Sequence, residues 1–175
     1  MKYVMMSGIL YREPNCVIAK LKSVFVGSEK RVYRKDGSLA LKTIIRELDA
    51  PDAKWTDVRF RNYVMLDTTD KEIAVARPNY AEGDDPSVVG WPICRMPRVD
   101  RADLEVQGNK YTLTMQNNKN HVLKNVDGQI IVQIIRRRLT GGWNIDVSER
   151  IAPELLCGLI AFCMYMEQEN EFLCV

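Results

Sequence analysis

The residues from Leu155 to Met166 read LLCGLIAFCMYM and contain neither a charge nor a side-chain amide. Pro153 and Glu154 come just before them, and both favour a first helical turn. Proline has no N–H to leave unpaired there, and a carboxylate stabilises the positive end of the helix dipole. The polar run EQEN at 167–170 follows the apolar stretch. The pattern predicts a hydrophobic C-terminal helix over about 153–168 that is apolar on every side.

A helix that is apolar all round is stable only when it is buried all round. At about 1.5 Å per residue the apolar stretch spans roughly 18 Å, well short of a bilayer core of roughly 30 Å, so no transmembrane segment is expected. Burial of its side chains contributes on the order of 20 kcal/mol as an upper bound. A sandwich of two sheets cannot surround a helix, whereas a barrel can. The alternative, a helix on one face of an open sheet, would expose half of these residues unless a partner covered them.

The rest of the chain is typical of antiparallel strands. Asp36-Gly37 and Asp127-Gly128 each separate two apolar stretches, and Asp-Gly supplies the positive φ angles of a tight hairpin turn. A weaker third hairpin runs from Tyr63 to Arg77. The three are similar but irregularly spaced, which favours one closed sheet over a propeller or solenoid. About eleven strands can be counted, and we therefore expect a single mainly β domain over 1–175, a closed antiparallel barrel around the helix.

Three other stretches carry predictions about local structure. The N-terminal residues MKYVMMSGILYREP are interpreted as an edge strand rather than a signal peptide, because Ser7 and Gly8 interrupt their apolar run. Alternation from Val17 through Val26 predicts strand with one face in solvent. Residues 78–99 hold four prolines, a density that excludes a central strand and predicts a long surface loop or a crossover between two halves of the sheet.

Composition restricts the function classes. The chain has a formal net charge of +2 at pH 7, too small to predict nucleic-acid or membrane affinity from bulk charge. The number of cysteines is odd and no CxxC occurs, which favours free thiols in a reducing, cytoplasmic setting over disulfides or a metal site. No cofactor is expected. The cysteines are Cys16, Cys94, Cys157, Cys163 and Cys174.

The helix and hairpins together resemble the tubby C-terminal-like superfamily, which includes tubby, the plant LURP-one-related proteins and the phospholipid scramblases. The stretch from Ala152 to Phe162 looks like the buried helix of that group, and the stretch from Gly141 to Phe172 looks especially like uncharacterised bacterial tubby-like proteins. The resemblance covers nearly the whole chain by order of elements and is specific in the C-terminal third. It implies a twelve-stranded barrel with a threaded helix. Because tubby binds phosphoinositides and scramblases act at membranes, it also implies a lipid-binding domain, peripheral at the membrane.

Arginines near two equivalent hairpins form the candidate ligand site. Arginine grips phosphate through two parallel hydrogen bonds, and several together raise the local potential. Strand alternation places Arg136 and Arg138 on one face. The hypothesis is a basic rim that binds anionic lipid head groups such as phosphoinositides. The alternative is a solvated rim whose arginines pair with Glu47, Asp67 or Asp146. The candidate residues are Arg31, Arg34, Arg136 and Arg138, with Lys30 beside them.

Nothing in the sequence indicates catalysis, and the chain is not expected to be an enzyme. His121, the single histidine, follows an asparagine-rich stretch and is predicted to lie in an exposed turn. No GxSxG motif is present. Asp84 and Asp85 are interpreted as solvated loop residues, with a calcium loop as the alternative. A second hypothesis makes the chain a protein-interaction or scaffolding domain that uses the proline-rich 78–99 loop and Trp91.

Overall fold

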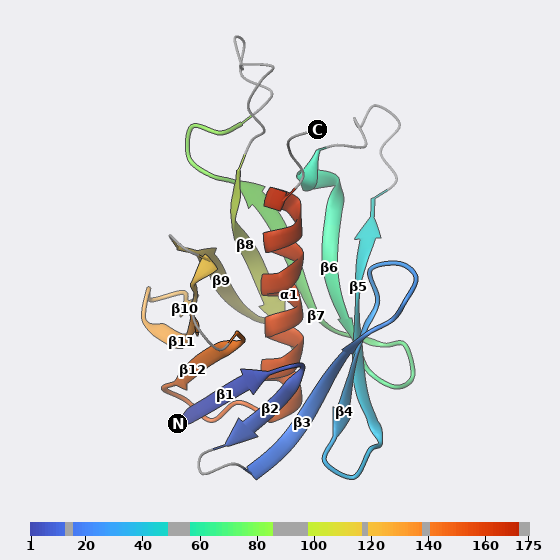
Figure 1. Cartoon of the computed structure of the whole chain (residues 1–175). Helices are drawn as coiled ribbons and strands as arrows, with labels where there is room; N and C mark the ends of the chain where they lie inside the picture. Colours follow the sequence, from blue (N-terminus) through green and yellow to red (C-terminus); the bar gives the residue numbers. More distant parts are fainter. Residues whose placement is uncertain (13–15, 49–56, 86–97, 117–118, 138–140, 172–175) are drawn as a thin grey trace.

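The computed structural model describes residues 1–12, 16–48, 57–85, 98–116, 119–137 and 141–171. These residues form twelve strands, one short 3₁₀ helix and one α-helix (Figure 1). The elements in chain order are β1 (Lys2–Met6), β2 (Ile9–Arg12), β3 (Cys16–Ser23), β4 (Lys30–Arg34), β5 (Leu39–Glu47), η1 (Val58–Phe60), β6 (Arg61–Leu66), β7 (Glu72–Tyr80), β8 (Val99–Val106), β9 (Asn109–Met115), β10 (His121–Asn125), β11 (Ile130–Arg136), β12 (Trp143–Val147) and α1 (Pro153–Glu171).

The strands form one closed antiparallel barrel. Each strand pairs with its neighbours in the sequence, and β1 also pairs with β12, with Lys2 opposite Asp146 and Met5 opposite Trp143. Because β1 is bonded on both sides, the described sheet has no free edge. The predicted closed barrel is confirmed. The edge-strand prediction for the N-terminus is wrong, since these residues form the β1–β2 hairpin, with Ser7 and Gly8 at positive φ in the turn.

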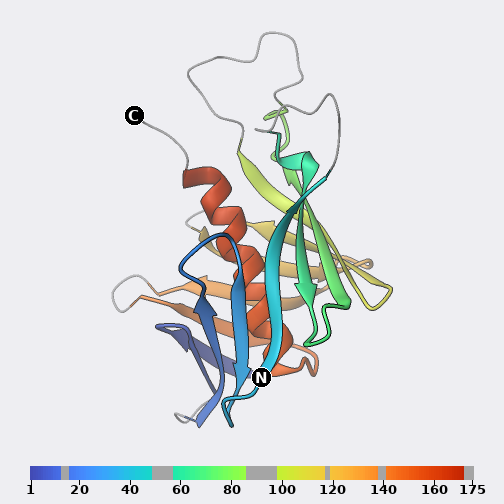
Figure 2. The ribbon, with the colours of Figure 1, turned by 90° about the vertical axis from the view of Figure 1, so that its right-hand side faces the viewer.

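Helix α1 runs through the barrel, as two perpendicular views show (Figures 1 and 2). Its residues from Leu156 to Cys163 are at most 5% exposed, and Tyr165 and Met166 are fully buried. The helix packs most closely against β3, β4, β5, β6 and β8. The predicted burial is therefore confirmed for the apolar stretch except at Leu155 and Met164, which are half-buried, and the helix extends to Glu171. None of the helices in the described ranges has the length and apolar content that crossing a bilayer requires.

An aromatic cluster joins the helix to the barrel wall. The ring of Tyr63 in β6 lies 5.3 Å from that of Tyr165 and 6.0 Å from that of Phe162, between centroids. All three side chains are fully buried. Tilted aromatic pairs at these distances add packing energy beyond the area they bury. The middle of the core is thus built from helix and β6 together.

The predicted hairpins are confirmed, but the predicted loop over 78–99 is wrong at its ends, since residues 78–80 belong to β7 and Val99 to β8. Gly37 and Gly128 have φ angles of 87° and 78° in the β4–β5 and β10–β11 turns. Pro78 lies within β7, opposite Ala102 of β8. The pairing of β7 with β6 stops at Ala76, so residue 78 has a neighbouring strand on one side only. Proline is tolerated there because its missing N–H need not serve a second ladder.

Three of the five cysteines lie in the described ranges, and all three are free. Cys16 is exposed, whereas Cys157 and Cys163 are buried in α1. Burial raises the pKa of Cys157 to about 12, so this thiol stays protonated and unreactive. The free-thiol prediction is confirmed for these three, while Cys94 and Cys174 lie outside the described residues.

Candidate functional site

The structure does not bring the candidate arginines together. Arg34 lies 3.5 Å from Glu154 in the first turn of α1, whereas Arg136 lies 3.1 Å from Glu167 near its last turns. The two glutamates are thirteen residues apart along the helix, which corresponds to about 20 Å. Arg34 and Arg136 therefore serve opposite ends of the helix. Arg138 lies outside the described residues.

These ion pairs hold the helix ends in the barrel. Glu167 is almost fully buried and also lies 4.0 Å from Lys119, and Glu169 accepts two hydrogen bonds from Arg61 of β6. Removing one partner of a buried ion pair leaves an uncompensated charge and is strongly destabilising. The sequence suggested that the arginines pair with Glu47, Asp67 or Asp146. Arg34 and Arg136 pair with acids of α1 instead. A structural role explains Arg34 and Arg136 without a ligand.

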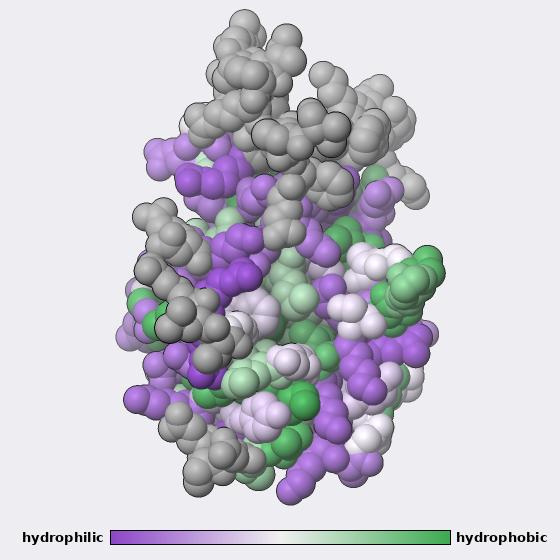
Figure 3. Space-filling view, viewed as in Figure 1, coloured by the Kyte–Doolittle hydropathy of each residue, from purple (hydrophilic) through white to green (hydrophobic). Residues whose placement is uncertain are grey.

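A different surface lies between β3 and β4, in the segment 24–29, named here the 24–29 loop. Its apex is apolar: Phe25 is 102% exposed and Val26 is 78% exposed. Figure 3 shows hydrophobic surface, in green, at the right-hand edge where Figure 1 places this loop. A phenylalanine with its whole ring in water is unusual, because burying it elsewhere would stabilise the fold by about 2 kcal/mol.

The base of the 24–29 loop is fixed to the core. The Tyr165 hydroxyl donates to the Ser28 carbonyl at 2.6 Å and accepts from Thr43 at 2.9 Å. The backbone N–H of Ile45 donates to the Ser28 hydroxyl at 3.0 Å, and the N–H of Val24 donates to the Glu29 carbonyl. These bonds position the loop against β5 and α1, so the exposed apolar apex is held away from the barrel wall.

Three cations stand side by side on the outer wall below the apex. Lys22 is directly opposite Arg31, which is directly opposite Lys42. Their neighbours Leu21, Val32 and Leu41 are buried, so the three cations point outward by strand alternation. We name Lys22, Arg31 and Lys42 the basic row. Like charges in directly opposed positions repel each other, which favours an anion placed over them.

Two acids accompany the basic row without cancelling its charge. Glu29 lies 2.6 Å from Arg31, and Asp70 pairs with Lys42. Lys30, which the sequence placed with these cations, points inward instead and is only 5% exposed. Its ammonium lies over the Tyr165 ring at 5.1 Å, and burial lowers its pKa. Of the candidate residues, only Arg31 belongs to the surface formed by the 24–29 loop and the basic row.

The 24–29 loop was not predicted, because the apolar residues up to Val26 resemble a continuation of the strand. Strand β3 ends at Ser23, and the prediction that Val24 and Val26 continue the alternation is wrong. A signal was present: Leu21 and Val24 are three residues apart, which breaks the period of two, and Gly27-Ser28 is a typical turn pair. Gly27 does adopt a positive φ of 84°.

His121 is in the core and not in an exposed turn, so that prediction is wrong. It is the first residue of β10, opposite Met115 of β9 and Ile134 of β11, and its side chain is fully buried. Neither ring nitrogen makes a well-formed hydrogen bond within the described residues. Burial lowers the pKa of His121 to about 4, a shift that the nearby Lys119 backbone opposes only in part.

His121 gives the fold a pH dependence that can be measured. An unfolded histidine has a pKa of about 6.5, so between pH 6.5 and 4 the unfolded chain binds more protons than the folded one. Stability therefore falls as the pH falls through this range. Between pH 7 and 5 the wild type should lose about 2 kcal/mol more than His121→Leu, measured by urea unfolding. Identical losses in the two proteins would contradict a neutral buried histidine.

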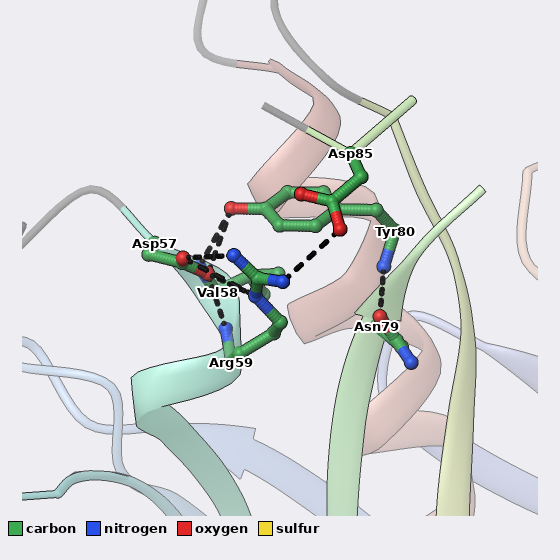
Figure 4. A network of polar contacts seen from close by, with 6 residues as sticks. All are labelled: Asp57, Val58, Arg59, Asn79, Tyr80 and Asp85. Carbon is green, nitrogen blue, oxygen red and sulfur yellow. Dashed lines mark hydrogen bonds and ion pairs between the residues drawn. The ribbon is translucent and has the colours of Figure 1, made fainter. Parts of the chain in front are cut away.

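A polar network clamps η1 to β7 (Figure 4). Arg59 donates to both Asp57 and Asp85, and the Tyr80 hydroxyl donates to Asp57 at 3.0 Å while accepting from the N–H of Val58. Although burial opposes it, hydrogen bonds from Arg59 and Tyr80 lower the pKa of Asp57. Burial raises the pKa of Tyr80 to about 12. The network is satisfied internally, which indicates a structural clamp.

Asp84 and Asp85 were predicted to be solvated loop residues, and this prediction is wrong for Asp84, which is buried. Asp84 is 4% exposed and accepts the backbone N–H of Arg98 at 3.0 Å, while Asp85 pairs with Arg59. Within the described ranges no cluster of three or more His, Cys, Asp or Glu side chains could hold a metal ion. Residues 86–97, including Trp91, lie outside the described residues, and the scaffolding hypothesis stays a prediction.

Comparison of the chain with family models, curated proteins and solved structures finds no match. The resemblance to the tubby-like superfamily therefore stays a prediction, and the function must be argued from this chain's own surface.

Proposed function

We propose that the chain is a non-enzymatic, tubby-like binding domain that associates reversibly with anionic membranes from the cytoplasmic side. The contact surface is the 24–29 loop together with the basic row. One observation carries the proposal: a fully exposed phenylalanine and a neighbouring exposed valine stand beside three outward-facing cations. An apolar apex enters the acyl boundary of a membrane, and cations beside it meet the lipid phosphates.

The expected affinity for an anionic membrane is modest. Moving Phe25 and Val26 out of water is worth about 3 kcal/mol together, and the net charge of +1 that the basic row keeps beside Glu29 and Asp70 contributes about 1 kcal/mol near an anionic surface. The sum is on the order of 4 kcal/mol, which corresponds to a dissociation constant of about 1 mM. Such binding is reversible and depends on salt, because the cationic contribution is screened within about 10 Å at 0.1 M salt.

The lipid phosphate is the shared chemistry of the candidate ligands. Arg31 offers a planar guanidinium that can grip a phosphate with two hydrogen bonds, once it leaves Glu29. Phosphoinositides carry several phosphates on one head group and would span more of the basic row than phosphatidylserine does. The tubby-like resemblance agrees with this ligand class by analogy.

Liposome sedimentation tests the proposal with two sets of variants. Phe25→Ser/Val26→Ser should lower the affinity for vesicles containing phosphatidylserine or phosphoinositide at least tenfold. Val126→Ser is the matched control, because Val126 is 77% exposed at the β10–β11 turn, far along the chain from the loop. Lys22→Glu/Arg31→Glu should abolish the preference for anionic over phosphatidylcholine vesicles, whereas Arg77→Glu on β7 should retain it.

The outcomes separate the proposal from its alternatives. Binding that rises at low salt, is lost in the loop variants and survives in both controls supports it. Absence of vesicle binding at low salt, where attraction is strongest, overturns it. Equal binding by wild type and the Phe25→Ser/Val26→Ser variant would assign the interaction to another surface.

A further inference from the structure

A cavity of about 220 Å³ lies beside the N-terminal half of α1, on the side facing β8 to β11. It exceeds the roughly 150 Å³ cavity that is sufficient to hold benzene. None of its lining residues belongs to the 24–29 loop or the basic row. Its wall is mostly apolar and includes Met65, Leu104, Leu123, Ile131, Leu155 and Leu159.

The position of the helix explains why the space exists. Gly158 has no side chain, and the Met65 thioether of β6 lies where a Cβ would stand, so helix and β6 approach closely. The closest neighbours of α1 are β3, β4, β5, β8 and β6. Strands β9, β10 and β11 are not among these close neighbours, and the cavity lies toward them, with Met65 of β6 and Leu104 of β8 also in its lining. A cavity with an aliphatic lining excludes water and accepts an apolar guest.

The mouth of the cavity is polar. Gln107 and Asn109 of the β8–β9 turn and Glu149 and Arg150 before α1 line it. Arg150 is exposed and forms no ion pair in the part of the chain that the structure describes. Amide N–H groups and a guanidinium are donors for a carboxylate, and the nearby helix N-terminus also favours negative charge. Glu149 is exposed, so water screens its repulsion.

We propose that this cavity binds the alkyl chain of a medium-chain fatty acid, with the carboxylate at the mouth on Arg150. The volume equals roughly seven water volumes, which suits a chain of roughly six to ten carbons. The apolar wall selects the chain and the polar mouth selects the head group. The site shares no residue with the proposed membrane surface, so the two proposals are tested separately.

Calorimetric titration of the whole chain with octanoate tests the proposal. Saturable binding is expected, and each methylene removed toward butyrate should weaken it about fourfold. Leu155→Phe should lower the affinity at least tenfold by placing a ring in the cavity. Arg150→Gln should weaken octanoate while leaving octanol unchanged, and Arg77→Gln, on the outside of β7, should leave both unchanged.

Two readouts keep the test decisive. Leu155 is only half-buried, so the folding of Leu155→Phe can be confirmed by circular dichroism before titration. Octanoate that fails to saturate, or that binds Leu155→Phe as well as wild type, overturns the cavity as the site. Equal binding of octanoate, octanol and octylamine overturns the carboxylate assignment. Loss of vesicle binding by the loop variants does not bear on either outcome.

Discussion

Gly142→Ala should leave little folded protein, with a loss of at least 4 kcal/mol in the free energy of unfolding. The residue has a φ of 78°, and a Cβ there would overlap the carbonyl oxygen of Met5. The Met5 carbonyl and the Gly142 backbone that would carry the Cβ lie where β1 pairs with β12. Neither can move without opening the ladder that closes the barrel. Losses of this size are exceptional for single substitutions and indicate a specific backbone conflict.

Gly37→Ala is the matched control for Gly142→Ala. Gly37 has a similar φ of 87°, but nothing lies within 4 Å of the position where its Cβ would be. Its substitution should therefore cost only the left-handed backbone penalty of about 1 kcal/mol. Urea unfolding followed by circular dichroism measures both. Equal losses at the two positions would mean that the β1–β12 contact tolerates displacement.

Phe162→Ala should destabilise the protein by about 3–5 kcal/mol, whereas Phe25→Ala should leave its stability within about 0.5 kcal/mol of wild type. Phe162 is fully buried beside Tyr63 and Tyr165, and its removal leaves a cavity inside the barrel. Phe25 has its whole side chain in solvent and supports no packing. The difference in stability loss thus distinguishes a phenylalanine in the core from one on the surface.

Two measurements on this pair check the assignment. Thermal unfolding should show a large drop in Tm for Phe162→Ala and almost none for Phe25→Ala. Vesicle sedimentation should show the reverse order, since Phe25→Ala removes the membrane contact and Phe162→Ala, where folded, retains it. A strongly destabilised Phe25→Ala would mean that the ring packs on the barrel and is not available to lipid.

The architecture was predictable because its determinants are local in the sequence. The stretch from Leu155 to Met166 reveals its burial by composition alone, and Asp36-Gly37 and Asp127-Gly128 mark their turns by backbone requirements. These signals need no knowledge of what lies across the barrel. The errors also follow from this limit: Pro78 is acceptable because its second neighbouring strand is missing, a fact of register that no local pattern contains.

The surfaces were less predictable, because they depend on which way each side chain points and on how well the helix fills the barrel. Arg34 and Arg136 sit in similar hairpins, yet each meets an acid of the helix, since the strands carry them to opposite ends of the lumen. Lys30 and Arg31 are adjacent in sequence and point to opposite sides of the wall. The cavity beside Leu155 reflects an imperfect match between helix and barrel volumes, which no sequence period encodes.

The pairing of β1 with β12 also dictates when this protein can fold during its synthesis. The first strand finds its partner on one side only after residue 146 has been translated, and the helix that fills the lumen comes later still. Until then the inward side chains of the earlier hairpins have no complete core to enter. A nascent chain of this kind stays aggregation-prone on the ribosome for most of its elongation, and the long sequence separation between β1 and β12 makes the final closure slow.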